Sequence, residues 1–272
     1  MRPHAGRPLA DQATQLTGYF TGALKRSATM AASLLVLLAL WSLAAHLWPS
    51  RALPPPSDVW RTLLREAASG DLAFHVGATL ARVCVSFIAA MSIGAAIGIF
   101  LGLHRHADNF LNPWIVLFLN VPALVVIVLA YIWFGLNEAA AIGAVAVNKI
   151  PNVIVTLRAG ARALDPRYSD LAEVYRFSWP DRLRHVVLPQ LQPYFSAASR
   201  SGLALIWKIV LVVELLGRSN GVGFQIYLYF QLFEVDAILA YTLSFVAIML
   251  AVEILLVQPF ERSSSRWRGA AA

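Results

Sequence analysis

The chain has 272 residues, of which 58% are hydrophobic and only 14% are charged, and its mean hydropathy is +0.64. A soluble globular domain carries about 25% charged residues, so this composition excludes an ordinary soluble protein and indicates an integral membrane protein. The net charge of +7 does not indicate nucleic-acid binding, because the Lys and Arg residues lie mainly between or beside apolar runs. The single cysteine, Cys84, excludes an intrachain disulfide and a cysteine-based metal cluster.

The N-terminal residues 1–29 are polar and basic, and we expect them to form a disordered cytoplasmic leader. Residues 30–48 are an apolar stretch that is too long for the h-region of a signal peptide and has no clear cleavage site, so we expect a retained transmembrane helix. The apolar positions of residues 59–67 then predict a short helix at the membrane surface, capped by Ser57 or Asp58.

Further apolar stretches predict five more transmembrane helices, at residues 73–103, 110–136, 139–157, 188–216 and 236–259. Gly94 and Gly98 form a G-x-x-x-G pair that would let another helix approach closely. Pro122 lacks an amide proton and predicts a kink within the third helix. The two histidines of residues 104–109 lack a third nearby ligand for a metal, so we interpret these residues as a solvated turn.

Six spans place both termini on the same side of the membrane. If that side is the cytoplasm, fourteen of the 22 Lys and Arg residues lie in cytoplasmic segments, four lie in outer loops and four lie inside spans. The positive-inside rule therefore predicts that the N- and C-termini are both cytoplasmic, including a basic tail at residues 261–272. The same rule places the polar residues 165–189 in the cytoplasm.

Residues 165–189, here called the 165–189 segment, read DPRYSDLAEVYRFSWPDRLRHVVLP. Asp165 is a good N-cap and Pro166 a good first helical residue, so we expect a helix that runs to about Tyr175. Ser178 and Asp181 have the spacing of a capping box, so a second helix is expected to begin there and to end near residue 187.

The first of these helices has one apolar face, made by Leu171, Val174 and Tyr175 at helical spacing, with Phe177 and Trp179 at the following bend. An apolar surface of this kind indicates a binding partner. The alternative is that the segment packs against the membrane helices of its own chain. The residues alone do not decide between these two interpretations.

The 165–189 segment resembles the EAA loop of ABC-importer permeases, whose pattern is E-A-A, three residues, G, nine residues and I-x-L-P. When residues 186–189 are aligned with its end, E-A-A falls on Asp170, Leu171 and Ala172, and the glycine falls on Arg176. If the turn needs a left-handed residue, Arg176 costs about 1 kcal/mol relative to glycine. Either the bend uses another geometry, or Arg176 contacts the partner.

Other stretches are similar to the nitrate/sulfonate/taurine branch of these permeases. They are the LPPPSDV sequence of residues 53–59, the Arg158-Ala159-Gly160 sequence before the segment, and residues 201–223. The resemblance extends over residues 53–260 and implies an all-α membrane protein with six transmembrane helices, the type I ABC importer fold. It implies a permease domain at residues 30–260, with a coupling loop at residues 159–188.

The function that this resemblance implies is ATP-driven import of a small solute, by alternating access, across the bacterial inner membrane. The implied partners are separate ATPase subunits, a periplasmic binding protein and a second permease copy. The chain contains no G-x-x-x-x-G-K-[ST] sequence, so we expect no enzyme activity and no cofactor in this chain, with ATP and Mg²⁺ bound by the ATPase subunit. The residues implied to couple to the ATPase are Asp170, Leu171, Ala172, Val174, Tyr175, Arg176, Phe177, Trp179, Leu188 and Pro189.

Lys149, which follows Asn148 in the fourth expected span, is the candidate for the substrate pathway. An ionisable residue inside a membrane marks a functional site by default, because burying its charge is costly. Lys149 then favours an anion such as nitrate, a sulfonate or taurine. The alternative is a structural pair with a carboxylate, and the candidates for that pair are Glu138, Glu214 and Glu253. The other basic residues in the spans, expected to extend toward the membrane surface, are Arg82, Arg200 and Lys208.

Two other classes of function would need sequence features that differ from those of an ABC permease. An ion-coupled secondary transporter would carry an internal repeat and paired acids within the membrane, and the sequence shows neither clearly. A membrane-embedded enzyme would need catalytic groups gathered within the spans, whereas the six histidines are scattered along the chain.

Overall fold

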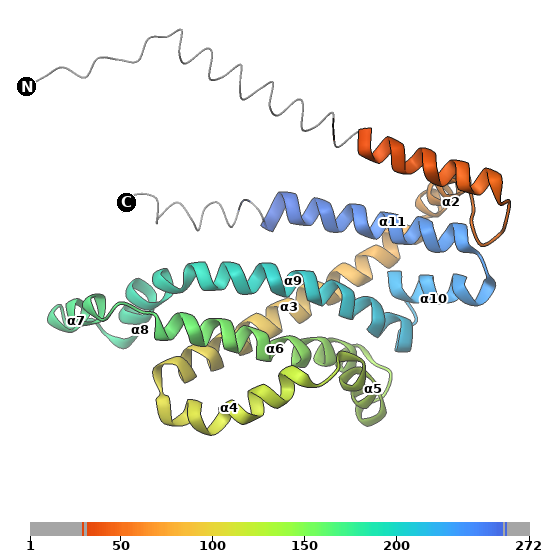
Figure 1. The fold of residues 1–272 in the computed structure, drawn as a ribbon. Coiled ribbons are helices and arrows are strands. Elements are labelled where there is room, and N and C mark those ends of the chain that lie inside the picture. The colour runs from red at the N-terminus through yellow and green to blue at the C-terminus, as the bar shows by residue number, and fades with distance from the viewer. Residues whose placement is uncertain (1–28, 30–31, 258, 260–272) are drawn as a thin grey trace, which may run out of the picture. The chain divides into compact units, whose positions relative to one another are not determined.

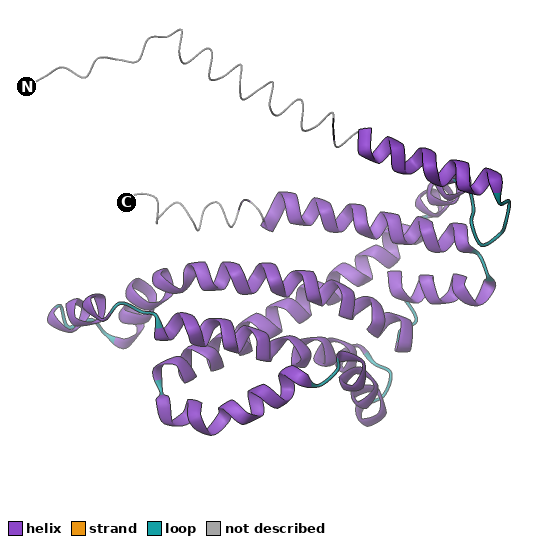
Figure 2. Ribbon diagram, viewed as in Figure 1, coloured by secondary structure: helices purple, strands orange, loops and turns teal. Residues whose placement is uncertain are grey.

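The structure is a computed structural model that describes Thr29, residues 32–257 and Pro259. Nearly all of the expected leader, and the whole expected basic tail, lie outside these residues. Within the part of the chain that is described, every regular element is a helix, and the only β pairing is an isolated bridge between Ser50 and Leu53 (Figure 2). The expectation of an all-α protein is confirmed.

Contacts divide the chain into two units, Met1–Arg61 and Thr62–Ala272. In the first unit, an apolar helix covers Ala32–Leu47, and the Trp41 indole donates a hydrogen bond to the Pro54 carbonyl at 3.0 Å. Helix α2 begins in this unit and covers Pro56–Ser69. The expected cap at Ser57 or Asp58 is wrong, because Pro56, whose fixed φ suits the first helical position, starts the helix earlier.

The second unit is built around three long helices, α3 (Asp71–Leu103), α6 (Glu138–Arg162) and α9 (Leu188–Gly217), which pack against one another (Figure 1). Helix α3 approaches α6 closely along the expected glycine pair. A Cβ atom on Gly94 would lie 2.6 Å from the Val153 Cβ, and one on Gly98 would lie 2.8 Å from the Ile154 carbonyl oxygen. The expectation that these glycines allow close packing is confirmed.

The expected third span is two helices, α4 (Arg105–Asn120) and α5 (Ala123–Phe134), bent by 95° at the break between them. Val121 and Pro122 both have extended backbone conformations at this break. Proline disfavours the helical conformation for the residue before it, so the chain leaves the helix at Val121. The expected kink is therefore correctly placed, but it is a full interruption.

The chain continues after α9 with α10 (Val222–Leu232) and α11 (Val235–Val252), which extends as a π-helical turn η2 (Glu253–Val257). Helix α10 packs against α9 and α11 (Figure 1). The main hydrophobic core lies among α3, α5, α6, α9, α10 and α11. Its larger buried side chains include Ile127, Tyr131, Ile206, Trp207, Tyr241 and Phe245.

Among the described residues, three helices are long and apolar enough to cross a membrane: Asp71–Leu103, Glu138–Arg162 and Val235–Leu255. The bent pair α4 and α5 would make a fourth span if counted as one. The helix Ala32–Leu47 is shorter, and α9 carries Arg200, Lys208 and Glu214 along its length. In the described part of the chain, the structure therefore supports a multi-pass membrane protein with three or four apolar spans, and the expectation of six spans is not confirmed.

Candidate functional sites: the 165–189 segment and the buried charges

The 165–189 segment contains two short helices, as its capping signals predict. The Asp165 carboxylate accepts the Arg167 amide at 2.9 Å and starts α7 (Pro166–Val174). The Ser178 hydroxyl oxygen accepts the Asp181 amide at 3.4 Å and starts α8 (Trp179–Arg182). Both predicted helix starts are confirmed. The second helix does not end near residue 187, because a π-helical turn, η1 (Leu183–Val187), leads directly into α9.

The turn after α7 requires a left-handed residue, and that residue is Arg176, with φ +51°. Its amide donates to the Glu173 carbonyl at 2.9 Å, and the Phe177 amide donates to the Ala172 carbonyl at 2.9 Å. These two bonds form a Schellman cap, in which glycine normally occupies the left-handed position. The interpretation that the bend uses another geometry is therefore wrong, and Arg176 bears the cost of about 1 kcal/mol.

The apolar surface of the segment faces away from the membrane helices of its own chain. Val174, Trp179 and Tyr175 have exposed fractions of 77%, 75% and 68%, and Leu171 is also exposed. Ala172, whose carbonyl is part of the Schellman cap, is buried. The Arg176 side chain is exposed and forms no hydrogen bond or ion pair with a described residue. The structure therefore contradicts the alternative in which this surface packs against the membrane helices of its own chain.

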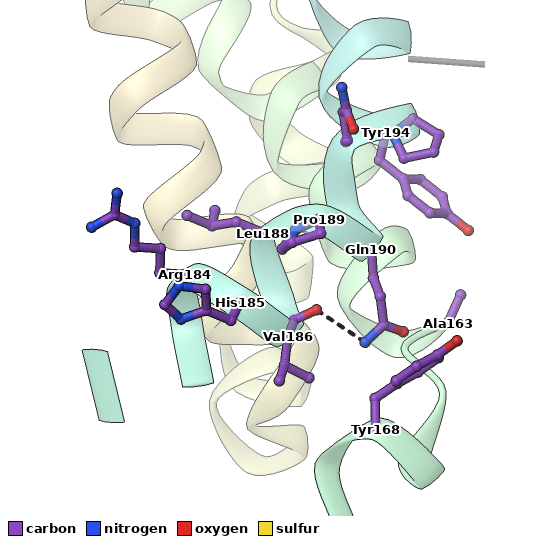
Figure 3. Close-up of a pocket in the computed structure, with 11 residues that line it drawn as sticks. Ala163, Tyr168, Arg184, His185, Val186, Leu188, Pro189, Gln190 and Tyr194 are labelled. Atoms are coloured by element: carbon purple, nitrogen blue, oxygen red, sulfur yellow. Dashed lines mark hydrogen bonds between the residues drawn. The ribbon is translucent and has the colours of Figure 1, made fainter. Parts of the chain in front are cut away.

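Behind the segment lies an open pocket of about 910 Å³ (Figure 3). On one side it is lined by Ala163 and Tyr168, and on the other by residues of η1 and the first turns of α9. Leu188 and Pro189, expected to couple to the ATPase, lie on its wall (Figure 3). The Gln190 side chain, also on the wall, donates a hydrogen bond to the Val186 carbonyl at 3.0 Å.

Lys149 is buried between three helices, with an exposed fraction of 2%. A Cβ atom on Gly202 of α9 would lie 3.0 Å from the Lys149 Cε and 3.8 Å from its Nζ, and 3.6 Å from the ring of Phe87 in α3. The Lys149 ammonium forms no hydrogen bond or ion pair with any residue that the structure describes. Asn148 is half-buried beside it.

The carboxylates considered as structural partners of Lys149 are paired with arginines instead. Glu138 and Glu214 bind Arg82 at 2.6 and 2.7 Å, and Glu253 lies 3.6 Å from Arg200. The interpretation of Lys149 as half of an ion pair is therefore wrong for the described residues. A buried charge that lacks a partner lowers the stability of the folded protein, so stability does not explain the presence of a lysine at position 149.

The expectation that Arg82 extends toward the membrane surface is wrong. Arg82 is 4% exposed, and its guanidinium also donates to the Asn220 carbonyl at 2.9 Å. Glu214 is fully buried and accepts hydrogen bonds from the Thr79 hydroxyl and the Gly223 amide, each at 2.9 Å. This network joins α3, α6 and α9 to the turn before α10, and sequence reasoning did not identify it. The sequence feature that could have indicated this ion pair is the presence of one arginine and one glutamate in two separate apolar spans.

The interpretation of residues 104–109 as a solvated turn is only partly correct, because His104, Arg105 and His106 are exposed but only His104 lies outside a helix. Helix α4 begins at Arg105, and Asp108 in its first turn is 4% exposed. Its carboxylate binds Arg158 of α6 at 2.7 Å and also pairs with Arg162. The ion pairs join α4 to the end of α6 next to the 165–189 segment.

The arrangement of these helices is that of an ABC transporter permease. The fold matches a chain in the inward facing MetNI methionine ABC transporter, with a TM-score of 0.64 and 17% sequence identity, over 74% of this chain and 99% of that chain. At this level of identity, the match shows the fold alone.

Residues 90–262 match the family described as binding-protein-dependent transport system inner membrane component, and the chain belongs to this family. It is 28% identical to the SsuC protein of Bacillus subtilis, named for aliphatic sulfonates transport, over 86% of each chain. It is also 28% identical to the taurine transport system permease protein TauC of Escherichia coli, over 90% of this chain and 92% of that protein. The bicarbonate transport system permease protein CmpB of Synechococcus elongatus is 28% identical, over 77% of this chain and 80% of that protein. The expected resemblance to ABC-importer permeases of the nitrate/sulfonate/taurine branch is confirmed.

Proposed function

We propose that this chain is the membrane-spanning subunit of an ATP-driven importer that moves a small anion across the bacterial inner membrane into the cytoplasm. The family assignment supports a role in binding-protein-dependent transport. In this proposal, a periplasmic binding protein delivers the solute, two copies of the chain enclose the pathway, and separate subunits bind and hydrolyse ATP with Mg²⁺. The chain itself has no catalytic role.

The observation that carries this proposal is the exposed apolar surface of the 165–189 segment, formed by Leu171, Val174, Tyr175 and Trp179. An exposed patch of this kind marks a binding site for another protein or for a membrane. The exposed Arg176, which follows Tyr175 in the chain, has a side chain with no partner among the described residues. Both features fit an ATPase subunit that offers an apolar groove and a carboxylate.

The topology in this proposal has both termini in the cytoplasm. The basic residues of the 165–189 segment and of the end of α6, including Arg158, Arg162 and Arg176, then lie on the cytoplasmic side, as the positive-inside rule requires. ATP-driven movement of the segment would pass into α9 and alternate the pathway between outward and inward exposure.

An anionic solute is favoured by Lys149, whose buried ammonium has no partner among the described residues. A bound anion would supply the missing charge. The relatives named for sulfonates and bicarbonate handle solutes that carry a negative group, which supports the same class of solute for this chain.

Co-purification of the permease with its ATPase subunit tests the central step. Changing Leu171, Val174 and Tyr175 together to Asp places three charges on the proposed interface, and we expect the ATPase to be lost. The matched control is Phe233→Asp, which charges another apolar residue that is 80% exposed but lies in the turn between α10 and α11. Retention of the ATPase by the triple variant would refute this docking surface.

A further inference from the structure

The Gln190 side chain joins the two ends of the 165–189 segment. Its Oε1 accepts the amide of Asp165, where the segment begins, at 3.0 Å. Its Nε2 donates to the carbonyl of Val186, near the end of the segment, at 3.0 Å (Figure 3). Asp165 and Gln190 are 25 positions apart in the sequence. The side-chain oxygen and nitrogen of Gln190 each make a hydrogen bond.

The junction that Gln190 spans is an irregular part of the helix. Pro189 has no amide proton to give to the carbonyl four residues earlier. The Leu188 amide bonds to the Leu183 carbonyl, five residues earlier, which makes the π-helical turn η1. Such turns are often found at functional sites. A wide turn next to a proline is a point at which α8 could move without moving α9.

The opposite end of the segment is joined to α6 by a short connection. Helix α6 ends at Arg162, and α7 begins at Pro166. A displacement of α7 could therefore be absorbed by these connecting residues and by η1. The hydrogen bond from the Asp165 amide to Gln190 opposes this, because it fixes the start of α7 to the first turn of α9. The bond to the Val186 carbonyl holds the Gln190 side chain in place against η1.

We propose that Gln190 is a positioning residue for energy coupling: it transmits the ATPase-driven displacement of α7 directly to α9. This inference rests on the proposed function. Gln190 does not hold the segment in place alone, because Ala161 of α6, Val187 of η1 and Leu191 of α9 form a buried apolar cluster. Loss of the Gln190 hydrogen bonds should therefore leave the segment folded but weaken its connection to α9.

The test measures two distances by electron paramagnetic resonance in the complex purified with its ATPase. Spin labels are placed on a Cys84→Ser background, in one sample at Val85 and Arg167, and in another at Val85 and Lys208. Arg167 is exposed on α7 and lies outside the proposed ATPase surface. These report the movement of the segment and of α9, respectively, relative to α3. In the parent complex, we expect Mg²⁺ and ATP to change both distances.

In the Gln190→Met variant, which keeps the length of the side chain but not its amide, the change at Arg167 should persist and at least half of the change at Lys208 should be lost. Gln192→Met is the matched control: Gln192 lines the same pocket and its side chain makes no hydrogen bond with a described residue, so both changes should be kept. Full movement of α9 in Gln190→Met would overturn the inference. Failure of the parent chain to bind an ATPase would instead overturn the proposed function, and this inference with it.

Discussion

The guanidinium of Arg82 binds the carboxylate of Glu214 at 2.7 Å, and the two side chains have exposed fractions of 5% and 0%. They are 132 residues apart in the sequence. Their pairing joins α3 to the end of α9, where Glu214 also accepts the Gly223 amide. The charges therefore stabilise a turn as well as a helix pair.

Removing either partner alone should be strongly destabilising, because it leaves the other charge buried without compensation. We expect Arg82→Met to lower stability by about 3–5 kcal/mol. The Arg82→Met, Glu214→Met double variant should lose less than the sum of the two single variants. Thermal unfolding in detergent measures this, with the exposed Lys208→Met as the control. Additive losses would show that the two side chains act independently.

The left-handed conformation of Arg176 gives a prediction with opposite effects on stability and binding. Arg176→Gly should stabilise the isolated permease by about 1 kcal/mol, because glycine adopts this conformation without strain. It should also weaken the association with the ATPase, which we measure by titrating the ATPase onto the purified permease. Arg182→Gly, in the helical conformation of α8, is the control and should destabilise the chain. Unchanged binding by Arg176→Gly would show that the Arg176 side chain does not contact the partner.

The close approach of α3 to α6 predicts that a single methyl group at Gly98 is harmful. The added Cβ would lie 2.8 Å from the Ile154 carbonyl oxygen, so the helices must separate. We expect Gly98→Ala to cost about 1–3 kcal/mol. At Gly77 of the same helix, a Cβ meets nothing within 4 Å, and Gly77→Ala should stabilise α3 by up to about 1 kcal/mol. If both variants shift the unfolding temperature in the same direction, the contact at Gly98 does not limit the packing of α3 against α6.

The Lys149 charge, which no described residue pairs with, predicts that its removal impairs transport but not folding. Lys149→Met keeps the length of the side chain but removes the ammonium, and since no ion pair with a described residue is lost, the permease should fold and bind its ATPase. Uptake into proteoliposomes that contain the complex and its binding protein should fall at least tenfold, and Lys149→Arg should retain part of it. Labelled taurine, an alkanesulfonate and bicarbonate are the probes. Normal uptake by Lys149→Met would remove this residue from the pathway.

The features that the sequence predicted well are local ones. Asp165 and Ser178 cap helices by accepting amides that lie two or three residues away. The capping residue and the helix start that it stabilises therefore lie within one short stretch of sequence. Pro122 likewise marks the break between α4 and α5. The size of the bend, 95°, depends on how α5 packs against α6 and α9, and no local pattern carries this information.

The buried ion pairs could not be predicted in the same way. The partners of Arg82 are 56 and 132 residues away, and the carboxylate of Asp108 lies 50 residues from Arg158. Hydropathy alone places a lone arginine near the end of an apolar span at the membrane surface. Only the packing of α3 against α6 and α9 shows that Arg82 points into the protein, and that no carboxylate of the described residues pairs with Lys149.

Site-directed crosslinking at Val174 tests the central claim most directly. A Val174→Cys variant on the Cys84→Ser background places a thiol on the apolar surface of α7, where the side chain is 77% exposed. In intact membranes that contain the complex, a short bifunctional reagent should link this residue to the ATPase subunit, and a matched Phe233→Cys variant should give no such product. Absence of the product at Val174, or equal amounts at both positions, would contradict ATPase binding at the 165–189 segment.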